Sequence, residues 1–250
     1  MTEGSIQSWD ERRDYIIAGD TDATVAFAAE HWVHSAIRSI QQKGHFFVAL
    51  SGGSTPKQIY ARLASEHKTA LDWSKVHLFW SDERNVPLDH KESNYRMALE
   101  SGLGSLPIPK NQIHPMRKSQ DPVHSAQDYE DLIHRIIGAP LFDLVMLGVG
   151  EDGHTASLFP HSPALQEETK LVAANHIPDL DQWRITLTYP AINHSARAAF
   201  YALGANKQAI IPIVLNCAIR SPFPASAIGT PEHKALWILD RPAAHLLPSK

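Results

Sequence analysis

The stretch that decides the fold is HFFVALSGGSTP, residues 45–56. Its first half, 45–50, is a continuous apolar run of the length that is typical of a buried strand. A helix is predicted from Pro56 to about Glu66, with Thr55 as its cap and Pro56 in its first turn. A buried strand that passes through a glycine turn into a helix is the repeating unit of an α/β fold with a parallel sheet.

The same alternation of apolar strands and amphipathic helices continues along the whole chain. Further helices are predicted at about 22–43, from about Ser93, from Asp121 and Pro122 to Gly138, and near Asn206 with Pro212 in its early part. Further strands are predicted at 76–81, 142–148, 171–175, 184–188, 196–204 and 235–239, and 107–115 is expected to be a loop. The pattern predicts one α/β domain over 1–250, with a core of about 9–247 and a Rossmann-like, mainly parallel sheet flanked by helices.

Composition narrows the kinds of partner. The chain has 250 residues, 43% of them hydrophobic, which is enough for a substantial core. Its net charge is -4 and it has no basic stripe, so we expect neither nucleic acid nor a membrane as a partner. The single cysteine, Cys217, cannot form an internal disulfide. The polar start of the chain lacks the apolar segment of a signal peptide, and we therefore expect a cytoplasmic protein.

Residues 51–56, SGGSTP, have the features of a phosphate-binding loop. Gly52 and Gly53 allow a tight turn and a close approach of the backbone to a ligand. The following helix start offers free N–H groups, and the hydroxyls of Ser54 and Thr55 add further contacts. The spacing is not that of a Walker A loop, and a plain strand-to-helix turn remains an equal alternative at this point.

A bound phosphate also requires cationic side chains. Arg84 in SDER and Lys207 in GANK each lie just after or beside a predicted strand end, and Arg184 in WRITLT is a weaker candidate. The alternative for each of them is a solvated surface charge.

The stretch FDLVMLGVGEDGHTASLFP, residues 142–160, points to acid–base chemistry. An apolar strand ends in a glycine-rich loop that presents Glu151, Asp152 and His154. An imidazole titrates near neutrality, so His154 can both accept and return a proton. Asp152 can orient the ring or stabilise the imidazolium, whereas the alternative is a histidine that only supports the loop.

Other kinds of site fit this loop poorly. Residues 148–153 match GxGxxG, but two acidic residues stand where a pyrophosphate would lie, and Pro160 interrupts any long helix. A metal site is disfavoured because no HExxH and no Cys/His set with zinc spacing occurs. A serine hydrolase is disfavoured because there is no GxSxG.

The motifs SGGSTP, DER and GEDGH each follow a predicted strand, and ligand sites in α/β sheets form at the carboxyl ends of strands. Together with RITLT and GANK, in this order, they resemble the 6-phosphogluconolactonase family over about 9–247. That family is related to the glucosamine-6-phosphate deaminases and has a fold related to ribose-5-phosphate isomerase.

The resemblance implies an enzyme that hydrolyses 6-phospho-D-glucono-1,5-lactone to 6-phosphogluconate, the second step of the oxidative pentose phosphate pathway, without a cofactor. By motif match, His154 is the general base, and Asp82 and Asp152 join it as catalytic candidates. The resemblance further implies that Arg84 and Lys207 lie near the phosphate, and that the loop for the phosphoryl group consists of Gly52, Gly53, Ser54 and Thr55.

Two alternatives stay open. A glucosamine-6-phosphate deaminase-like isomerase typically has a further acid after the histidine, but 155–160 is TASLFP and contains no carboxylate. A non-catalytic sugar-phosphate sensor would keep the phosphate loop and tolerate loss of His154. One departure from the family pattern is His161, which stands where a small residue is more usual. Whether the protein is a monomer or a small homo-oligomer is left open.

Overall fold

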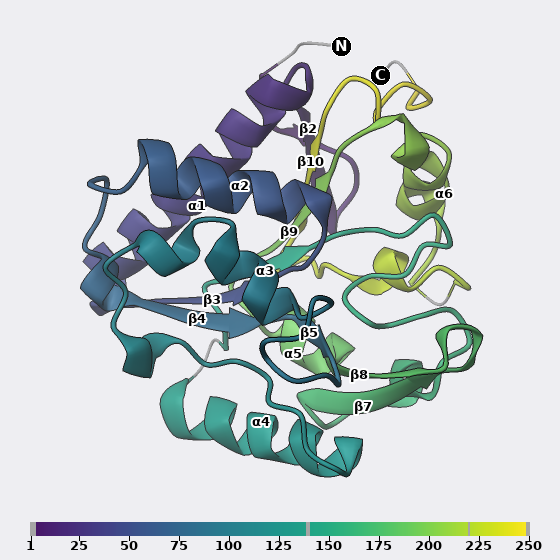
Figure 1. Cartoon of the computed structure of the whole chain (residues 1–250). Helices are drawn as coiled ribbons and strands as arrows, with labels where there is room; N and C mark the ends of the chain where they lie inside the picture. Colours follow the sequence, from purple (N-terminus) through teal and green to yellow (C-terminus); the bar gives the residue numbers. More distant parts are fainter. Residues whose placement is uncertain (1–3, 139–140, 220, 249–250) are drawn as a thin grey trace.

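The computed structural model describes residues 4–138, 141–219 and 221–248, and it has an α/β architecture (Figure 1). Its larger sheet has the strand order β1-β2-β10-β9-β6-β3-β4, and every pair is parallel except β1 with β2 at one edge. These strands are β1 (Gln7–Ser8), β2 (Arg13–Ile17), β3 (Phe46–Leu50), β4 (Val76–Trp80), β6 (Leu144–Leu147), β9 (Ala198–Ala202) and β10 (Ala235–Leu239). The predicted fold class, a mainly parallel sheet flanked by helices, is confirmed.

The connections supply the helices that flank this sheet. The α-helices are α1 (Thr21–Lys43), α2 (Ser54–Glu66), α3 (Asn94–Glu100), α4 (Pro122–Ile136), α5 (Tyr189–Asn193) and α6 (Ile210–Asn216). Short 3-10 turns occupy Trp73–Lys75, Leu103–Ser105, Lys110–Gln112, Pro163–Gln166, Pro178–Leu180, Ala205–Lys207 and Pro224–Ala227. In Figure 1, α1 and α2 lie side by side, while α4 packs against a second, smaller sheet.

Helix α1 shows how local sequence sets the limits of these elements. Asp20 caps its start by accepting a hydrogen bond from the N–H of Ala23. Gly44 ends it in the left-handed conformation, with φ of 81°, and donates its N–H to the carbonyl of Ile40. That conformation favours glycine because a Cβ would be strained there.

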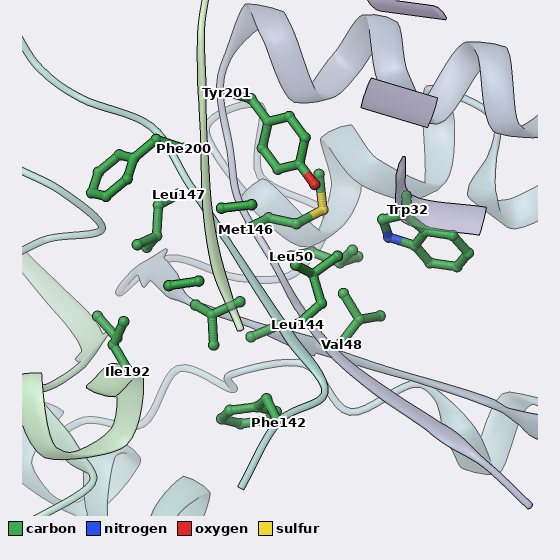
Figure 2. Close-up of a cluster of buried hydrophobic side chains, with 14 of the residues drawn as sticks. Trp32, Val48, Leu50, Phe142, Leu144, Met146, Leu147, Ile192, Phe200 and Tyr201 are labelled. Atoms are coloured by element: carbon green, nitrogen blue, oxygen red, sulfur yellow. The ribbon is translucent and has the colours of Figure 1, made fainter. Parts of the chain in front are cut away.

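The core lies between the larger sheet and the helices. All five residues of β3 and all four of β6 are buried, as expected for parallel strands that are covered on both faces. Figure 2 shows Trp32 from α1 near Val48 and Leu50 of β3, with Met146 of β6 beside Tyr201 of β9. This packing fixes the carboxyl ends of β3, β6 and β9 relative to one another.

A second, smaller sheet was not expected from the sequence. It is antiparallel, with the order β5 (Asp82–Arg84), β8 (Gln182–Leu187) and β7 (Val172–Ile177). The segments predicted as strands at 171–175 and 184–188 are strands, but they do not join the parallel sheet, because the turn between them is too short for a crossover helix. The DER segment follows the strand predicted at 76–81, as expected, and is itself strand β5.

Smaller differences concern helix starts. Helix α2 begins at Ser54 with Gly53 at the cap position, and it has no side-chain cap; Thr55 therefore does not cap it. Gly53 turns the chain early, at φ of 104°, which moves the helix start back by two residues. The helix expected near Asn206 is divided into a 3-10 turn and α6, which contains Pro212 in its first turn.

Within the described ranges, no helix is long and apolar enough to cross a membrane. The expected cytoplasmic location, the single-domain organisation and the relation to ribose-5-phosphate isomerase stay predictions.

Candidate active site

The carboxyl ends of β3, β6 and β9 and the smaller sheet together surround a pocket of about 500 Å³, here called the main pocket. It brings together segments that are far apart in the chain. Every site residue expected from the sequence lines it, apart from Asp152: Gly52, Gly53, Ser54, Thr55, Asp82, Arg84, His154, Arg184 and Lys207. Asp152 instead lies directly behind one of these residues.

His154 is held in place on two sides. Its Nδ1 lies 2.6 Å from Oδ1 of Asp152, and its ring stacks on Phe159 with 4.1 Å between ring centroids. The same carboxylate oxygen accepts the backbone N–H of His154 at 3.1 Å. If Nδ1 carries the proton that Asp152 accepts, Nε2 is unprotonated and available as a base. The side chain is 31% exposed, so it remains accessible to solvent and to a ligand.

The loop that carries His154 is closed by its own backbone. Gly150 donates its N–H to the carbonyl of His154 at 2.9 Å, and a Cβ at position 150 would overlap the imidazole. Thr155 donates its hydroxyl to the carbonyl of Gly148 at 2.8 Å. No helix follows the GxGxxG match, because 151–162 consist of turns and a bridge between Thr155 and Leu158. The loop therefore lacks the helix start on which a dinucleotide pyrophosphate would rest.

Asp82 is a buried carboxylate at the junction of the two sheets. Its Oδ2 accepts the hydroxyl of Ser157 at 2.6 Å, and its Oδ1 lies 3.4 Å from the amide nitrogen of Asn94. Ser157 belongs to the loop that carries His154, so Asp82 connects that loop to β5. The carboxylate is consequently fixed at the wall of the pocket.

Arg84 and Arg184 face each other across neighbouring strands. They are directly paired in the register of β5 and β8, and both line the main pocket. The Nε atoms of both are buried without a hydrogen-bond partner, although one Arg84 Nη donates to the carbonyl of Glu92 at 2.5 Å. Burial, with a further contribution from Arg84, lowers the pKa of Arg184. Like charges placed directly opposite each other are unfavourable, so this pair favours an anion between them.

Lys207 also lines the main pocket. It lies in the 3-10 turn after β9, half-buried, and no carboxylate of the described residues lies within 4.0 Å of its ammonium group. Its neighbour Asn206 donates to Glu151 at 3.1 Å, which joins this turn to the loop of His154.

The start of α2 lies on the floor of the pocket. Because no side chain caps this helix, its first N–H groups are available to a ligand. A Cβ at Gly52 would overlap the side-chain amide of Asn94, so this close contact requires glycine. Ser51 is fixed from behind by the hydroxyl of Tyr60, which lies 3.1 Å from its N–H and 2.8 Å from its carbonyl.

Sequence analysis missed the buried Glu83. Its carboxylate accepts the backbone N–H groups of Arg84, Asn94 and Tyr95, each at 2.8 Å, and the hydroxyl of Ser93 at 3.0 Å. Burial raises the pKa of Glu83, and these hydrogen bonds oppose that effect. Glu83 thus ties β5 to the start of α3. A sequence signal existed, since Ser93 and Asn94 form a typical helix start.

Other pocket residues carried no motif. Leu180 and Tyr201 line the pocket, and Asn94 contacts both Asp82 and the phosphate-loop glycine. Among the residues that the structure describes, no three His, Cys, Asp or Glu side chains gather closely enough to hold a metal ion.

Comparison with known proteins gives a consistent result. The family described as glucosamine-6-phosphate isomerases/6-phosphogluconolactonase matches residues 19–237. The 6-phosphogluconolactonase of Chlamydia pneumoniae is 40% identical over 217 residues, which cover 86% of this chain and 83% of that protein. The one from Synechocystis is 41% identical over 217 residues, covering 84% and 88% respectively.

Solved structures extend the likeness to the whole architecture. The 6-phosphogluconolactonase from Trypanosoma cruzi superposes with a TM-score of 0.85 at 29% identity, covering 98% of this chain and 100% of that one. A monomeric glucosamine-6-phosphate deaminase superposes with a TM-score of 0.79 at 19% identity, covering 93% and 99%. The latter likeness concerns the fold alone.

Proposed function

The chain belongs to the family of glucosamine-6-phosphate isomerases and 6-phosphogluconolactonases, and from this premise we propose that it hydrolyses 6-phosphogluconolactone to 6-phosphogluconate by general-base catalysis. The reaction is a step of the pentose phosphate pathway. The observation that carries the mechanism is the main pocket, where a histidine beside a carboxylate faces the same space as three cations that form no ion pair with a described carboxylate. A lactone ester and a phosphoryl group are the two features that such a pocket is suited to bind.

The phosphoryl group is bound at the start of α2 in this proposal. The backbone of Gly52 and Gly53 and the hydroxyls of Ser54 and Thr55 supply donors, and the helix start adds a positive potential. The cations Arg84, Arg184 and Lys207 neutralise the dianion; the guanidinium groups suit a phosphate because their N–H groups form a planar fork. Remote binding of this kind orients the lactone and supplies energy for catalysis.

His154 acts at the other end of the substrate. Nε2 removes a proton from water while the water oxygen forms a bond to C1 of the lactone. Asp152 stabilises the imidazolium that results, because its carboxylate lies 2.6 Å from Nδ1. When the bond between C1 and the ring oxygen breaks, the imidazolium returns its proton to that oxygen. Water is consumed, one ester bond is cleaved, and His154 is regenerated.

Asp82 serves the same site from the wall between the two sheets. One oxygen accepts the hydroxyl of Ser157, and the other has only a long contact with Asn94. We assign Asp82 the task of accepting a hydrogen bond from a sugar hydroxyl. Its negative charge also stabilises the neighbouring Arg184, since it opposes the lowering of that residue's pKa.

The deaminase alternative is disfavoured by the chemistry of the loop. Ring opening and proton transfer between C1 and C2 of an amino sugar need more acid–base groups than hydrolysis of a lactone does. The segment 155–160, which follows His154, contains no carboxylate.

The experiment that tests the proposal measures two activities of the purified protein. We expect opening of 6-phosphogluconolactone well above its spontaneous rate, and no ammonia release from glucosamine 6-phosphate. Ammonia release without lactone opening would establish the deaminase instead, and binding of 6-phosphogluconate without either activity would establish a sensor.

A further inference from the structure

A second cavity, of about 580 Å³, lies at the other end of the larger sheet. Its floor includes Asp14, Ala199 and Leu236, which lie abreast on β2, β9 and β10. The main pocket, by contrast, uses Ala202 and Leu203 at the carboxyl end of β9. The second cavity is therefore separate from the proposed active site.

One face of α1 forms a wall of the second cavity. His31, Ser35 and Arg38 are spaced by three or four residues, so they lie along one stripe of the helix, with His34 beside them. Arg197 enters from the segment before β9. The remaining wall is the loop from Pro231 to Lys234.

Neither guanidinium group forms an ion pair with a carboxylate of the described residues. Arg38 is exposed and Arg197 is half-buried, and within the described part of the chain no carboxylate lies within 4.0 Å of either. Burial lowers the pKa of Arg197, and the positive charge of the nearby Arg38 lowers it further. Two like charges that share one cavity raise the electrostatic potential there and favour a bound anion.

The carboxylates around the cavity are mostly engaged elsewhere. Asp14 pairs with Lys234 at 3.1 Å, and Asp143, which lies near Arg197, pairs with Lys43 at 2.7 Å. Glu232 is exposed and remains the only lining carboxylate without an ion pair among the described residues. The cavity thus keeps an excess of positive charge.

His31 also lines the second cavity. Burial is the main cause, and the nearby Arg197 a smaller one, that lowers the pKa of His31 to about 4. The ring is therefore neutral at physiological pH. Its Nδ1 lies 3.2 Å from the hydroxyl of Tyr201, a residue that also lines the main pocket (its ring is labelled in Figure 2). The ring therefore offers hydrogen bonds rather than charge, and the charge comes from the two arginines.

We propose that the second cavity binds a phosphorylated small molecule, whose phosphoryl group contacts Arg38 and Arg197 and whose remaining part lies against the histidines of α1. Guanidinium groups without carboxylate partners form bidentate hydrogen bonds with phosphate oxygens. The cavity is similar in volume to the main pocket, so it admits a ligand of phosphosugar size.

Pyrophosphate is a suitable probe, and its stoichiometry is measured by isothermal titration calorimetry. We expect two equivalents bound to the unmodified protein. The double variant Arg38→Gln/Arg197→Gln should keep the equivalent in the main pocket and lose the other, and Arg184→Gln/Lys207→Met should do the reverse. The expected rise in Kd at the second cavity is about tenfold or more for each lost guanidinium.

A matched control is Lys68→Gln/Lys110→Gln, which removes two exposed charges outside both cavities. Equal weakening in this control, or a single equivalent that Arg184→Gln/Lys207→Met abolishes, would overturn the proposal. If the double variant does not fold, Arg38→Gln alone gives the answer, because Arg38 is exposed and has no described hydrogen bond; an unchanged Kd in that variant would also overturn it.

Discussion

Nδ1 of His154 and Oδ1 of Asp152 lie 2.6 Å apart, although the two residues are separated by one glycine only. Gly153 makes this possible by adopting φ of 79°, which bends the chain so that the two side chains meet beside the pocket. A Cβ at this position would, in addition, overlap Phe223. The acid–base pair is therefore built by a local turn, and its function can be tested with substitutions that leave the sheets intact.

Replacement of His154 tests the base directly. In His154→Ala, kcat for 6-phosphogluconolactone should fall by about 10²–10⁴-fold, because general acid–base help is lost, while KM changes little. The measurement is the rate of lactone opening corrected for spontaneous hydrolysis. Circular dichroism serves as the control for folding, and a near-normal kcat in the folded variant would mean that His154 is not the base.

Asp152→Asn keeps the size of the side chain and removes its charge. We expect kcat to fall about 10–100-fold, since a charge-assisted hydrogen bond to the imidazolium is lost. The neighbouring exposed Glu151 provides a matched control, because it hydrogen-bonds Asn206 and not His154. If Glu151→Gln lowered kcat as much as Asp152→Asn does, the orienting role of Asp152 would be refuted.

Arg184 should discriminate between phosphorylated and unphosphorylated lactones. In Arg184→Gln, KM for 6-phosphogluconolactone should rise about 10–100-fold, because a charged contact to the phosphoryl group is removed. Slow opening of unphosphorylated gluconolactone should be unaffected. Arg135→Gln, an exposed change on α4, is the control. Equal losses on both lactones would argue against a phosphate contact.

Glu83→Gln tests the connection between β5 and α3. The four described partners of the carboxylate are all donors, so an amide would place its own N–H₂ group against some of them. We expect the free energy of unfolding in urea to fall by about 1–3 kcal/mol and KM to rise as Arg84 and Asn94 shift. Glu100→Gln, on the exposed end of α3, should change neither quantity.

Acid should destabilise the protein through His114. Burial is the main cause, and the neighbouring His77 the smaller one, that lowers the pKa of His114 to about 4. In the unfolded chain the pKa is about 6.5. The stability contributed by the neutral ring is thus complete above pH 6.5 and is lost as the pH falls toward 4. For one such histidine, the drop in unfolding free energy between pH 7 and pH 5 is about 2 kcal/mol.

Urea unfolding of His114→Gln at pH 7 and at pH 5 isolates this contribution. In this variant the free energy of unfolding should fall between pH 7 and pH 5 by about 2 kcal/mol less than in the unmodified protein. The contribution of His31 to the fall remains. An unchanged drop would show that His114 does not couple to folding in this range.

The parallel sheet could be predicted because its strands are continuous apolar runs that end in glycine-containing turns. The strands β3, β6 and β9 all lie where the sequence places them, and the phosphate-loop and histidine motifs therefore meet at one edge. The smaller sheet could not be predicted, since alternation within β7 and β8 does not say which strand pairs with which. Only the observed register shows that Arg84 and Arg184 are directly opposite each other.

Residues that support the site without a motif were also beyond sequence analysis. Glu83 forms buried hydrogen bonds with partners 10 to 12 positions away in the sequence. Ser157 forms one with Asp82, which is 75 positions away. Such contacts depend on three-dimensional packing, and no spacing rule predicts them.

The docking of the two sheets has a consequence for substrate choice. The arginine pair belongs to the smaller sheet, whereas His154 follows a strand of the larger one, and the N–H of Leu187 bonds the carbonyl of Ser81 across the junction at 2.8 Å. With the proposed roles, the backbone therefore fixes the distance between the site for the phosphorus atom and the site for the ester carbon. A five-carbon homologue, whose chain is one carbon shorter, would engage one end of the site and leave the other out of reach.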